Sequence, residues 1–373
     1  MLVGIPKEIK DNEYRAGMVP SSVLELVHHG HEVLVETRLG EGIGYRDEDY
    51  ANAGARVVTS AEEIYQQAEL VIKVKEPQAQ ECKLLREGQV LFTYLHLAPD
   101  IQQTRALMDS GVTAIAYETV TTADGSLPLL APMSEVAGRL SVQAGATCLE
   151  KDHGGSGILL GGVPGVDSAH VLVIGGGIVG DNAAYIAKGM GAHVTILDNS
   201  VPRLRDLDIS YGGRVNCVFS NKASIEKYAL EADLVIGAVL VAGAAAPKLL
   251  SRDIIKAMKP GSVVVDVAID QGGCFETSHP TTHSDPTFIV DGVVHYCVAN
   301  MPGVVPRTSS FGLNNATLPY VLRLADAGWK KALASDPGFM QGLNIHAGQI
   351  CCEAVATAHG LPYTPANSLL PPA

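Results

Sequence analysis

The sequence lacks the features that would direct a chain into or across a membrane. No run of about 18 consecutive apolar residues occurs, so no transmembrane helix is expected. The N-terminal stretch MLVGIPKEIKDNEYR carries charges where a signal peptide needs an apolar centre. The 7 cysteines form no CxxC pair, and their odd number argues against a disulfide framework. We therefore expect a cytoplasmic protein.

Basic residues are also scarce. The chain has 27 Lys and Arg against 40 Asp and Glu, a formal net charge of −13. Nucleic acids and anionic membrane surfaces select basic footprints, so neither is an expected partner. Apolar residues make up 47% and charged residues 18%, which is typical of a compact enzyme and not of a disordered chain.

A length of 373 residues predicts more than one domain. Short apolar, β-branched runs alternate with amphipathic or Ala-rich segments, which is typical of parallel strands joined by helices. The first set of predicted strands is Leu2–Ile5, His31–Glu36, Leu70–Lys75, Val90–His96 and Val112–Glu118. The second set is Val171–Ile174, Val194–Asp198, Asp233–Val239, Ser262–Ala268 and His295–Ala299.

These patterns predict an α/β protein with two doubly wound parallel-sheet (Rossmann-like) domains and an interdomain cleft. Two helical patterns near the C-terminus, Leu313–Ala327 and Gln349–His359, have no strand companion and are expected to return to the first domain. The predicted domains are therefore a discontinuous substrate domain, 1–132 with 307–373, and an inserted nucleotide domain, 133–306. Ser134 is the expected N-cap of a bridging helix.

The most specific local motif is a strand, a GxGxxG turn and a helix. Gly175 permits the tight turn, Gly177 lets the backbone approach a pyrophosphate, and Gly180 lets helix and strand pack closely. Asp198 ends the next strand 23 residues after Gly175, where an acid binds the adenosine ribose. Its carboxylate would repel a 2′-phosphate, so NAD is the predicted cofactor; Arg203 leaves some tolerance of NADP open.

Ligands of open parallel sheets lie outside the carboxyl ends of the strands. The start of the helix after the glycine turn adds two cofactor candidates, Ile178 and Val179. The strand-end rule adds Val239, Leu240, Val267, Ala268, Ile269, Asp270, Val298, Ala299, Asn300 and Met301.

In the first domain the same rule nominates a substrate site. Oxidising a small amine or alcohol that carries a carboxylate needs a cation and a proton acceptor beside the nicotinamide. Lys75 and Arg15 are the candidate cations, and His96 carries an imidazole, which titrates near neutrality. Asp270 would enter from the nucleotide domain.

Plainer interpretations of these residues stay open at this point. Lys75 and Arg15 are also compatible with solvated surface positions, and Asp270 with a cap of the turn that follows it. The string His279–His283 contains two histidines four residues apart, but its prolines favour a loop over a metal site, and no metal is predicted.

Several long strings resemble the alanine dehydrogenase and pyridine nucleotide transhydrogenase family nearly end to end. They are VGIPKE with NEYR at the N-terminus, KVKEP, YLHL, LLAPMSEVAGR, GGVPG, AIDQGG, HPTTH and YCVANMP. The resemblance implies that Arg15 and Lys75 hold the substrate carboxylate, and that His96 and Asp270 are the catalytic pair. It also implies that Ser134 and Ser220 lie at the cofactor.

The reaction that the resemblance implies is the reversible, NAD-dependent oxidation of L-alanine to pyruvate and ammonium, in a cytoplasmic homohexamer. The chain departs from the family pattern at Ala16–Pro20, which follows Arg15, and at Ser156, where a basic residue is common. Alternatives are a transhydrogenase-like NAD-binding subunit, which would need a membrane partner, and a noncatalytic NAD-binding protein. A saccharopine-type dehydrogenase would need room for a bulkier substrate.

Overall fold

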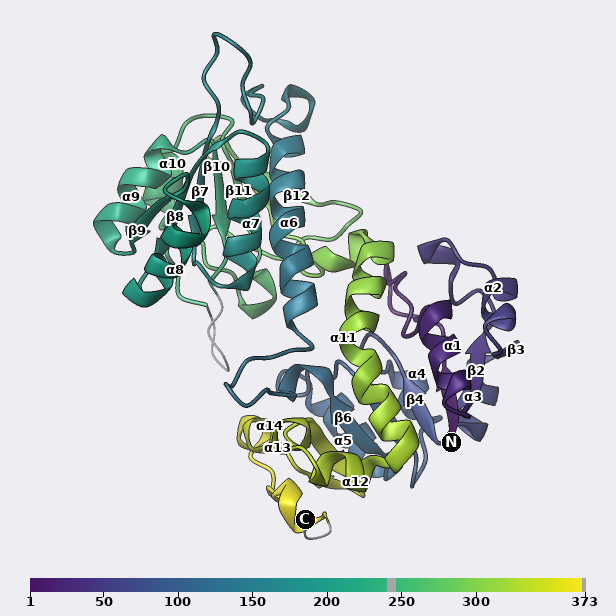
Figure 1. The fold of residues 1–373 in the computed structure, drawn as a ribbon. Coiled ribbons are helices and arrows are strands. Elements are labelled where there is room, and N and C mark those ends of the chain that lie inside the picture. The colour runs from purple at the N-terminus through teal and green to yellow at the C-terminus, as the bar shows by residue number, and fades with distance from the viewer. Residues whose placement is uncertain (240–245, 371–373) are drawn as a thin grey trace. The chain divides into compact units, whose positions relative to one another are not determined.

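A computed structural model describes residues 1–239 and 246–370, which form two compact units (Figure 1). The first unit comprises Met1–Met133 and the segment from Val305 onward, and the second comprises Ser134–Val304. Each unit contains one sheet dominated by parallel strands, so the predicted α/β fold class is confirmed. No helix in the described ranges combines the length and the apolar character needed to cross a membrane.

The sheet of the first unit has eight strands in the order β15-β14-β6-β5-β4-β1-β2-β3. Its parallel part, read from β3 to β6, follows the 3-2-1-4-5-6 order of nucleotide-binding sheets. Strands β14 and β15 extend one edge in antiparallel fashion. The strands are β1 (Leu2–Ile5), β2 (Glu32–Glu36), β3 (Arg56–Val58), β4 (Leu70–Ile72), β5 (Val90–Thr93), β6 (Thr113–Ala116), β14 (Leu343–His346) and β15 (Gln349–Ile350).

The central strands of this sheet are buried along their whole length because helices cover the sheet. The helices are α1 (Pro20–His28), α2 (Asp47–Asn52), α3 (Ala61–Gln67), α4 (Ala79–Cys82), α5 (Ile101–Ser110), α11 (Pro306–Ala327), α12 (Trp329–Ala334), α13 (Pro337–Met340) and α14 (Glu353–His359). Helix α11 is tied to the N-terminal loop, since Asn314 Oδ1 accepts the Val19 N–H at 2.7 Å. The C-terminal segment is thus part of this unit.

The second sheet has seven strands in the order β12-β13-β11-β10-β7-β8-β9, again 3-2-1-4-5-6 when read from β9 to β13. Only β12 runs antiparallel to its neighbour. The strands are β7 (His170–Ile174), β8 (His193–Asp198), β9 (Asn216–Phe219), β10 (Leu234–Gly237), β11 (Val263–Asp266), β12 (Thr287–Val290) and β13 (Val293–Tyr296). The carboxyl ends of the six parallel strands therefore all lie at the same edge of the sheet.

Helices flank this sheet, with α9 and α10 on one side and α6 and α7 on the other in Figure 1. The bounds are α6 (Ala131–Cys148), α7 (Ile178–Gly189), α8 (Val201–Tyr211), α9 (Lys222–Glu231) and α10 (Arg252–Ala257). Side chains of Ser200, Asn221 and Ser251 cap α8, α9 and α10, each accepting a backbone N–H of the first turn. Helix α7 follows Gly177 and has no such cap, so its first N–H groups remain for a ligand.

The structure corrects several local predictions. Helix α6 begins at Ala131, so Ser134 lies inside the helix and is not its N-cap; Pro132 is tolerated because it stands in the first turn. The C-terminal segment does carry strands, β14 and β15, and Gln349 belongs to a strand and not to a helix. Strands β4, β5 and β6 end two or three residues earlier than expected, so Lys75, His96 and Glu118 lie in the loops beyond them.

A buried ion network fixes the loop that follows β4. The Lys73 ammonium is fully buried and donates to Glu8 Oε2 at 2.9 Å and to Glu81 Oε1 at 2.7 Å. Burial alone would lower the pKa of Lys73, but the two carboxylates raise it above its ordinary value. Tyr65 donates its hydroxyl to Glu81 Oε1 at 3.0 Å. The first lysine of the KVKEP string is therefore part of the core, whereas Lys75 is only partly buried.

We expect Lys73→Met to lower the free energy of unfolding of the first unit by about 3 to 5 kcal/mol, because two buried carboxylates lose their counterion. Urea titration followed by circular dichroism measures the change. Lys83→Met, at the exposed C-cap position of α4, is the matched control and should change stability by less than about 0.5 kcal/mol. A loss below about 1 kcal/mol in Lys73→Met would contradict the assigned role.

Candidate active site

The glycine-rich turn has the geometry that the three-glycine motif requires. Gly175 has φ +103, and a Cβ there would lie 2.6 Å from the Ala238 carbonyl oxygen. A Cβ on Gly180 would lie 1.8 Å from the Gly175 carbonyl oxygen, so helix α7 and strand β7 approach closely. A Cβ on Gly177 would meet no described atom within 4 Å. The open side of Gly177 and the uncapped start of α7, with Ile178 and Val179, fit a pyrophosphate.

Asp198 lies at the end of β8, directly beside this turn. Its Oδ2 accepts the Gly176 N–H at 2.7 Å, and its Oδ1 accepts the Ser200 N–H at 2.7 Å. Both contacts hold the carboxylate at the carboxyl edge of the sheet. Ser220 follows β9 on the same edge, and its N–H donates to the Asp198 carbonyl at 2.9 Å. The predicted ribose-binding acid and Ser220 are thus adjacent.

The other predicted cofactor residues follow the carboxyl ends of further strands in the same sheet. They are Val239 after β10, Val267, Ala268, Ile269 and Asp270 after β11, and Val298, Ala299, Asn300 and Met301 after β13. Parallel pairing of β7, β10, β11 and β13 brings these segments to one edge. Leu240 lies outside the described residues, and Ser134 stands in the first turn of α6.

Asp270 belongs to a short 3-10 helix, Ile269–Gln271, and is exposed. The loop that carries it is fixed by Asp266, the last residue of β11. The buried Asp266 carboxylate accepts the Cys274 N–H at 2.9 Å and the Phe275 N–H at 3.2 Å. Gly272 and Gly273, at φ +88 and +73, permit the chain to turn back between Asp270 and Cys274.

In the first unit, Arg15 and Lys75 are the two candidate cations. Arg15 is buried and bound by Glu13, with Nη2 to Oε2 at 2.6 Å and Nε to Oε1 at 2.7 Å. The Lys75 ammonium makes no hydrogen bond or salt bridge to any residue that the structure describes. Burial lowers the pKa of Lys75, and the positive charges of Arg15 and Lys10 lower it further, against the opposing effect of Glu76. Lys75 is therefore the better placed cation for an incoming carboxylate.

His96 adopts a backbone conformation that L residues seldom adopt, with φ +49. Glu118 holds it there: Oε1 accepts the His96 N–H at 2.6 Å and the Leu95 N–H at 3.1 Å. The same oxygen lies 4.0 Å from His96 Nδ1, and the imidazole stacks on the Tyr94 ring at 5.8 Å with 9° between planes. These contacts hold the imidazole in place, and because its side chain is 45% exposed it remains accessible to a ligand.

Sequence reasoning placed Glu118 at a strand end but assigned it no role, and it did not single out Glu8, Glu13 or Asp266. Each of these carboxylates acts on a residue or loop of the predicted site through backbone or ion-pair contacts. For Asp266 and Glu118, the available signal was an acidic residue at, or just beyond, the end of a buried apolar strand. Such a residue is costly to bury unless it accepts hydrogen bonds. Glu8 and Glu13 lie further along the loop after β1 and gave no such signal.

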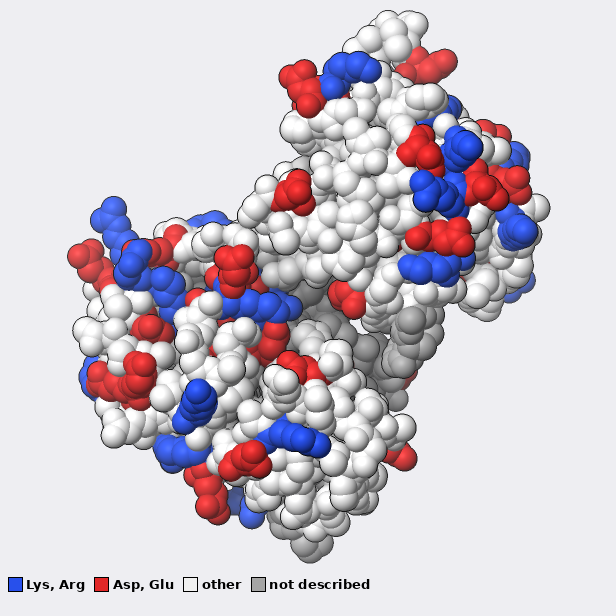
Figure 2. All heavy atoms as spheres, turned by 180° about the vertical axis from the view of Figure 1, so that it is seen from behind, with Lys and Arg blue, Asp and Glu red and all other residues white. Residues whose placement is uncertain are grey.

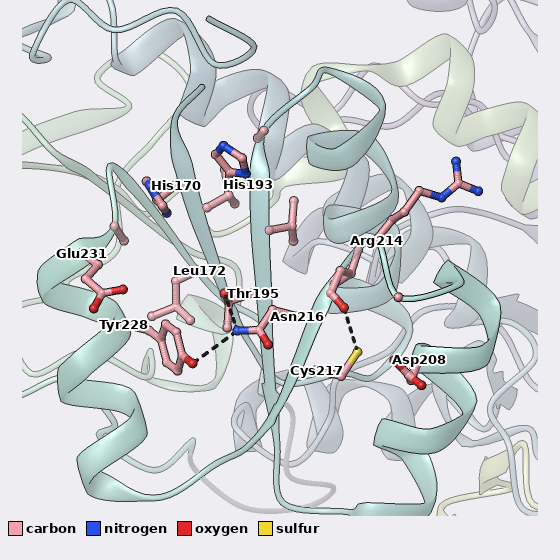
Figure 3. Close-up of a pocket in the computed structure, with 16 residues that line it drawn as sticks. His170, Leu172, His193, Thr195, Asp208, Arg214, Asn216, Cys217, Tyr228 and Glu231 are labelled. Carbon is pink, nitrogen blue, oxygen red and sulfur yellow. Dashed lines mark hydrogen bonds between the residues drawn. The ribbon is translucent and has the colours of Figure 1, made fainter. Parts of the chain in front are cut away.

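A separate pocket of about 600 Å³ lies at the opposite, amino edge of the second sheet (Figure 3). His170 and His193 open β7 and β8 there, and Asn216 donates to Thr195 Oγ1 and to the Tyr228 hydroxyl, both at 3.3 Å. Because the glycine-rich turn and Asp198 lie at the carboxyl edge, this pocket is not part of the dinucleotide site.

On the face drawn in Figure 2, acidic and basic side chains are interspersed, and the described residues there show no continuous basic area. This distribution agrees with the net charge of −13.

One sheet of nucleotide-binding type carries a glycine-rich turn with an acid at the end of the next strand, and the other carries titratable side chains at its carboxyl edge. This is the architecture of nicotinamide dinucleotide-dependent dehydrogenases. The chain belongs to the alanine dehydrogenase/PNT family. The model of the N-terminal domain of this family matches residues 4–137, and the model of its C-terminal domain matches residues 141–353. The resemblance drawn from the sequence strings is confirmed.

Comparisons with individual proteins support the same family. The chain is 60% identical over 370 residues to an alanine dehydrogenase of Halomonas elongata, covering 99% of this chain and 100% of that protein. A solved L-alanine dehydrogenase superposes with a TM-score of 0.94 at 53% identity, covering 96% of this chain and 99% of the other. A transhydrogenase of Sinorhizobium meliloti superposes with a TM-score of 0.83 at 25% identity, covering 94% and 100%. Membership implies a nicotinamide dinucleotide cofactor.

We expect Gly177→Ala to weaken NADH binding at least about tenfold while changing the unfolding temperature by less than about 2 °C, because its Cβ meets only the space intended for the pyrophosphate. Calorimetric titration and a thermal melt measure the two quantities. Gly180→Ala is the contrasting variant and should lower the unfolding temperature, since its Cβ would overlap the Gly175 carbonyl. Equal effects of both variants on stability would refute this assignment.

Proposed function

We propose that this chain is an alanine dehydrogenase that oxidises L-alanine reversibly to pyruvate and ammonium with NAD as cofactor. The observation that carries the proposal is the pairing of an unpartnered Lys75 ammonium with a braced His96 imidazole at one sheet edge. The full-length similarity to alanine dehydrogenases supports this reading over a transhydrogenase subunit. The first unit is the substrate domain and the second the NAD-binding domain.

The residues of the first unit bind and position the substrate. Lys75 and Arg15 pair with the substrate carboxylate, Lys75 directly and Arg15 from its buried position beside Glu13. This fixes the α-carbon and its amino group relative to His96. A nicotinamide held by the second unit would supply the hydride acceptor for the α-carbon.

His96 exchanges the proton at the α-carbon's substituent. Loss of hydride from alanine leaves an iminium, water adds to its carbon, and ammonium departs to give pyruvate. His96 takes the proton from the attacking water and returns one to the departing amine. Asp270 orients the imidazole or shares that proton transfer.

The cofactor is held by the second unit. Asp198 binds the adenosine ribose hydroxyls and selects NAD over NADP. Gly175, Gly177 and Gly180 with the start of α7 hold the pyrophosphate. Ser134, Arg203, Ser220 and the segments after β10, β11 and β13 line the remainder of the site. A homohexameric assembly and a cytoplasmic location belong to the same proposal, and analytical ultracentrifugation tests the assembly.

The function is tested by following NADH absorbance at 340 nm with a panel of 2-amino and 2-oxo acids. We expect turnover with L-alanine and pyruvate, and His96→Ala should abolish it while NADH still binds, because the imidazole serves the chemical step. Absence of alanine turnover in the parent protein would refute the function. Unchanged kcat in His96→Ala would refute the role of the imidazole alone.

The lowered pKa of Lys75 predicts a pH dependence of carboxylate binding. The ammonium form binds the carboxylate, so binding is intact below this pKa and is lost as pH rises through it. We expect the inhibition constant of propionate, a competitor without a titrating amine, to begin to rise at a lower pH than for an ordinary lysine, whose pKa is about 10.4.

Lys75→Arg is the matched control. Its guanidinium stays protonated, so propionate should bind with little change over the same pH range, although more weakly because the geometry differs. An inhibition constant that stays flat up to pH 10 in the parent protein would contradict the assignment of Lys75.

A further inference from the structure

Arg203 stands where a cation could accept the 2′-phosphate of NADP, but it is already engaged. It lies in the first turn of α8, a few residues beyond Asp198. Its Nε donates to the Gly176 carbonyl at 2.6 Å, and its Nη2 donates to Asp181 Oδ2 at 2.7 Å. Gly176 also donates its N–H to Asp198, so both backbone groups of Gly176 are engaged, the N–H by Asp198 and the carbonyl by Arg203.

Asp181 itself is held in place from the other side. It directly follows Gly180 in the first turn of α7. The Tyr211 hydroxyl, at the end of α8, donates to Asp181 Oδ1 at 2.6 Å and to the Asp181 carbonyl at 2.8 Å. One carboxylate oxygen thus serves Tyr211 and the other serves Arg203. Burial and the hydrogen bond to Asp181 raise the pKa of Tyr211, so the phenol remains a donor at neutral pH.

The balance of charge around the turn follows from these contacts. Asp198 binds the Gly176 N–H, and Asp181 binds the Arg203 guanidinium. The Asp181–Arg203 pair is partly exposed, with side chains 37% and 34% accessible, so its charges are screened. Two hydrogen bonds still fix the guanidinium, one to Asp181 and one to the Gly176 carbonyl. A 2′-phosphate, which carries nearly two negative charges, would have to break this pair to gain Arg203.

We propose that Asp181 is a second determinant of NAD selectivity, which acts by withholding Arg203 from the 2′-phosphate of NADP. The proposal rests on the proposed dinucleotide site but not on the identity of the amino-acid substrate. Asp198 repels the phosphate at the ribose, and Asp181 removes the cation that would otherwise compensate. The sequence alone left Arg203 as a possible source of NADP tolerance, and the Asp181 contact accounts for its suppression.

The direct test is the ratio of dissociation constants for NADPH and NADH, measured by isothermal titration calorimetry with the full chain and no other substrate. Asp181→Asn keeps the shape of the side chain but removes its charge. We expect the ratio to fall about tenfold in this variant, through tighter NADPH binding, because the guanidinium becomes available to the phosphate. Asp198→Asn should lower the ratio independently.

A double-mutant cycle separates this mechanism from a simple loss of negative charge. In an Arg203→Met background, Asp181→Asn should change the ratio by less than about twofold. Tyr211→Phe is the matched control within the cluster, since it removes the hydroxyl that donates to Asp181 but no charge, and it should also change the ratio by less than about twofold.

An unchanged ratio in Asp181→Asn would overturn the proposal, as would an equal fall in the presence and absence of Arg203. An equal loss of affinity for both dinucleotides in Asp181→Asn would assign Asp181 a purely structural role. A parent protein that binds NADH but does not oxidise alanine would refute the proposed reaction and leave this cycle interpretable.

Discussion

The carboxylate of Glu118 is the contact on which the proposed chemistry depends most. It accepts two successive backbone N–H groups, from Leu95 and His96, and so holds the imidazole on a segment with positive φ. A non-glycine residue in that conformation is destabilised by on the order of 1 kcal/mol or more. It keeps this conformation only where surrounding contacts, here the hydrogen bonds to Glu118, offset that free energy. Because His96 adopts positive φ three residues after the end of β5, the imidazole lies outside the buried strand, in the loop at the carboxyl edge of the sheet.

The same device recurs at the other functional loops. Glu8 accepts the N–H groups of Val74 and Lys75 after β4, at 2.7 and 3.2 Å. Asp198 and Asp266 do the same at the two loops of the second unit described above. In each case a carboxylate at a strand end or in a neighbouring loop accepts two backbone N–H groups that lie outside the strand ladders. The functional side chains themselves are therefore left unconstrained by these bonds and can meet a ligand.

Much of the architecture could be predicted from the sequence because it depends on local patterns. Buried β-branched runs indicated the central strands, and the spacing of Gly175, Gly177, Gly180 and Asp198 indicated the nucleotide turn. The strings shared with the family indicated the reaction, and the comparisons support it. Strands such as β9, whose residues are partly exposed, gave no such signal. Strand ends were misjudged because apolar character continues past the last ladder hydrogen bond into the loops.

The bracing contacts were beyond the reach of sequence patterns because they join residues far apart in the chain. Glu118 lies 22 positions from His96, and Glu8 lies 66 positions from Val74. The contact between Asp181 and Arg203 could not be predicted for another reason. Acidic residues are common in the first turn of a helix, where they interact favourably with the helix dipole, so Asp181 did not indicate a further role. Only the approach of α8 turns it into a partner of Arg203. The assignments of Arg15, Lys75, His96 and Asp270 to their roles remain predictions.

The measurement that tests the central claim most directly is steady-state alanine oxidation by Glu118→Ala, with Glu118→Gln as the isosteric companion. The account predicts that Glu118→Ala lowers kcat about 100-fold while the KM for alanine and the dissociation constant for NADH change less than about threefold, with partial recovery in Glu118→Gln, because only the imidazole is displaced. A kcat within about threefold of the parent value, in a protein with the parent's unfolding temperature, would contradict it.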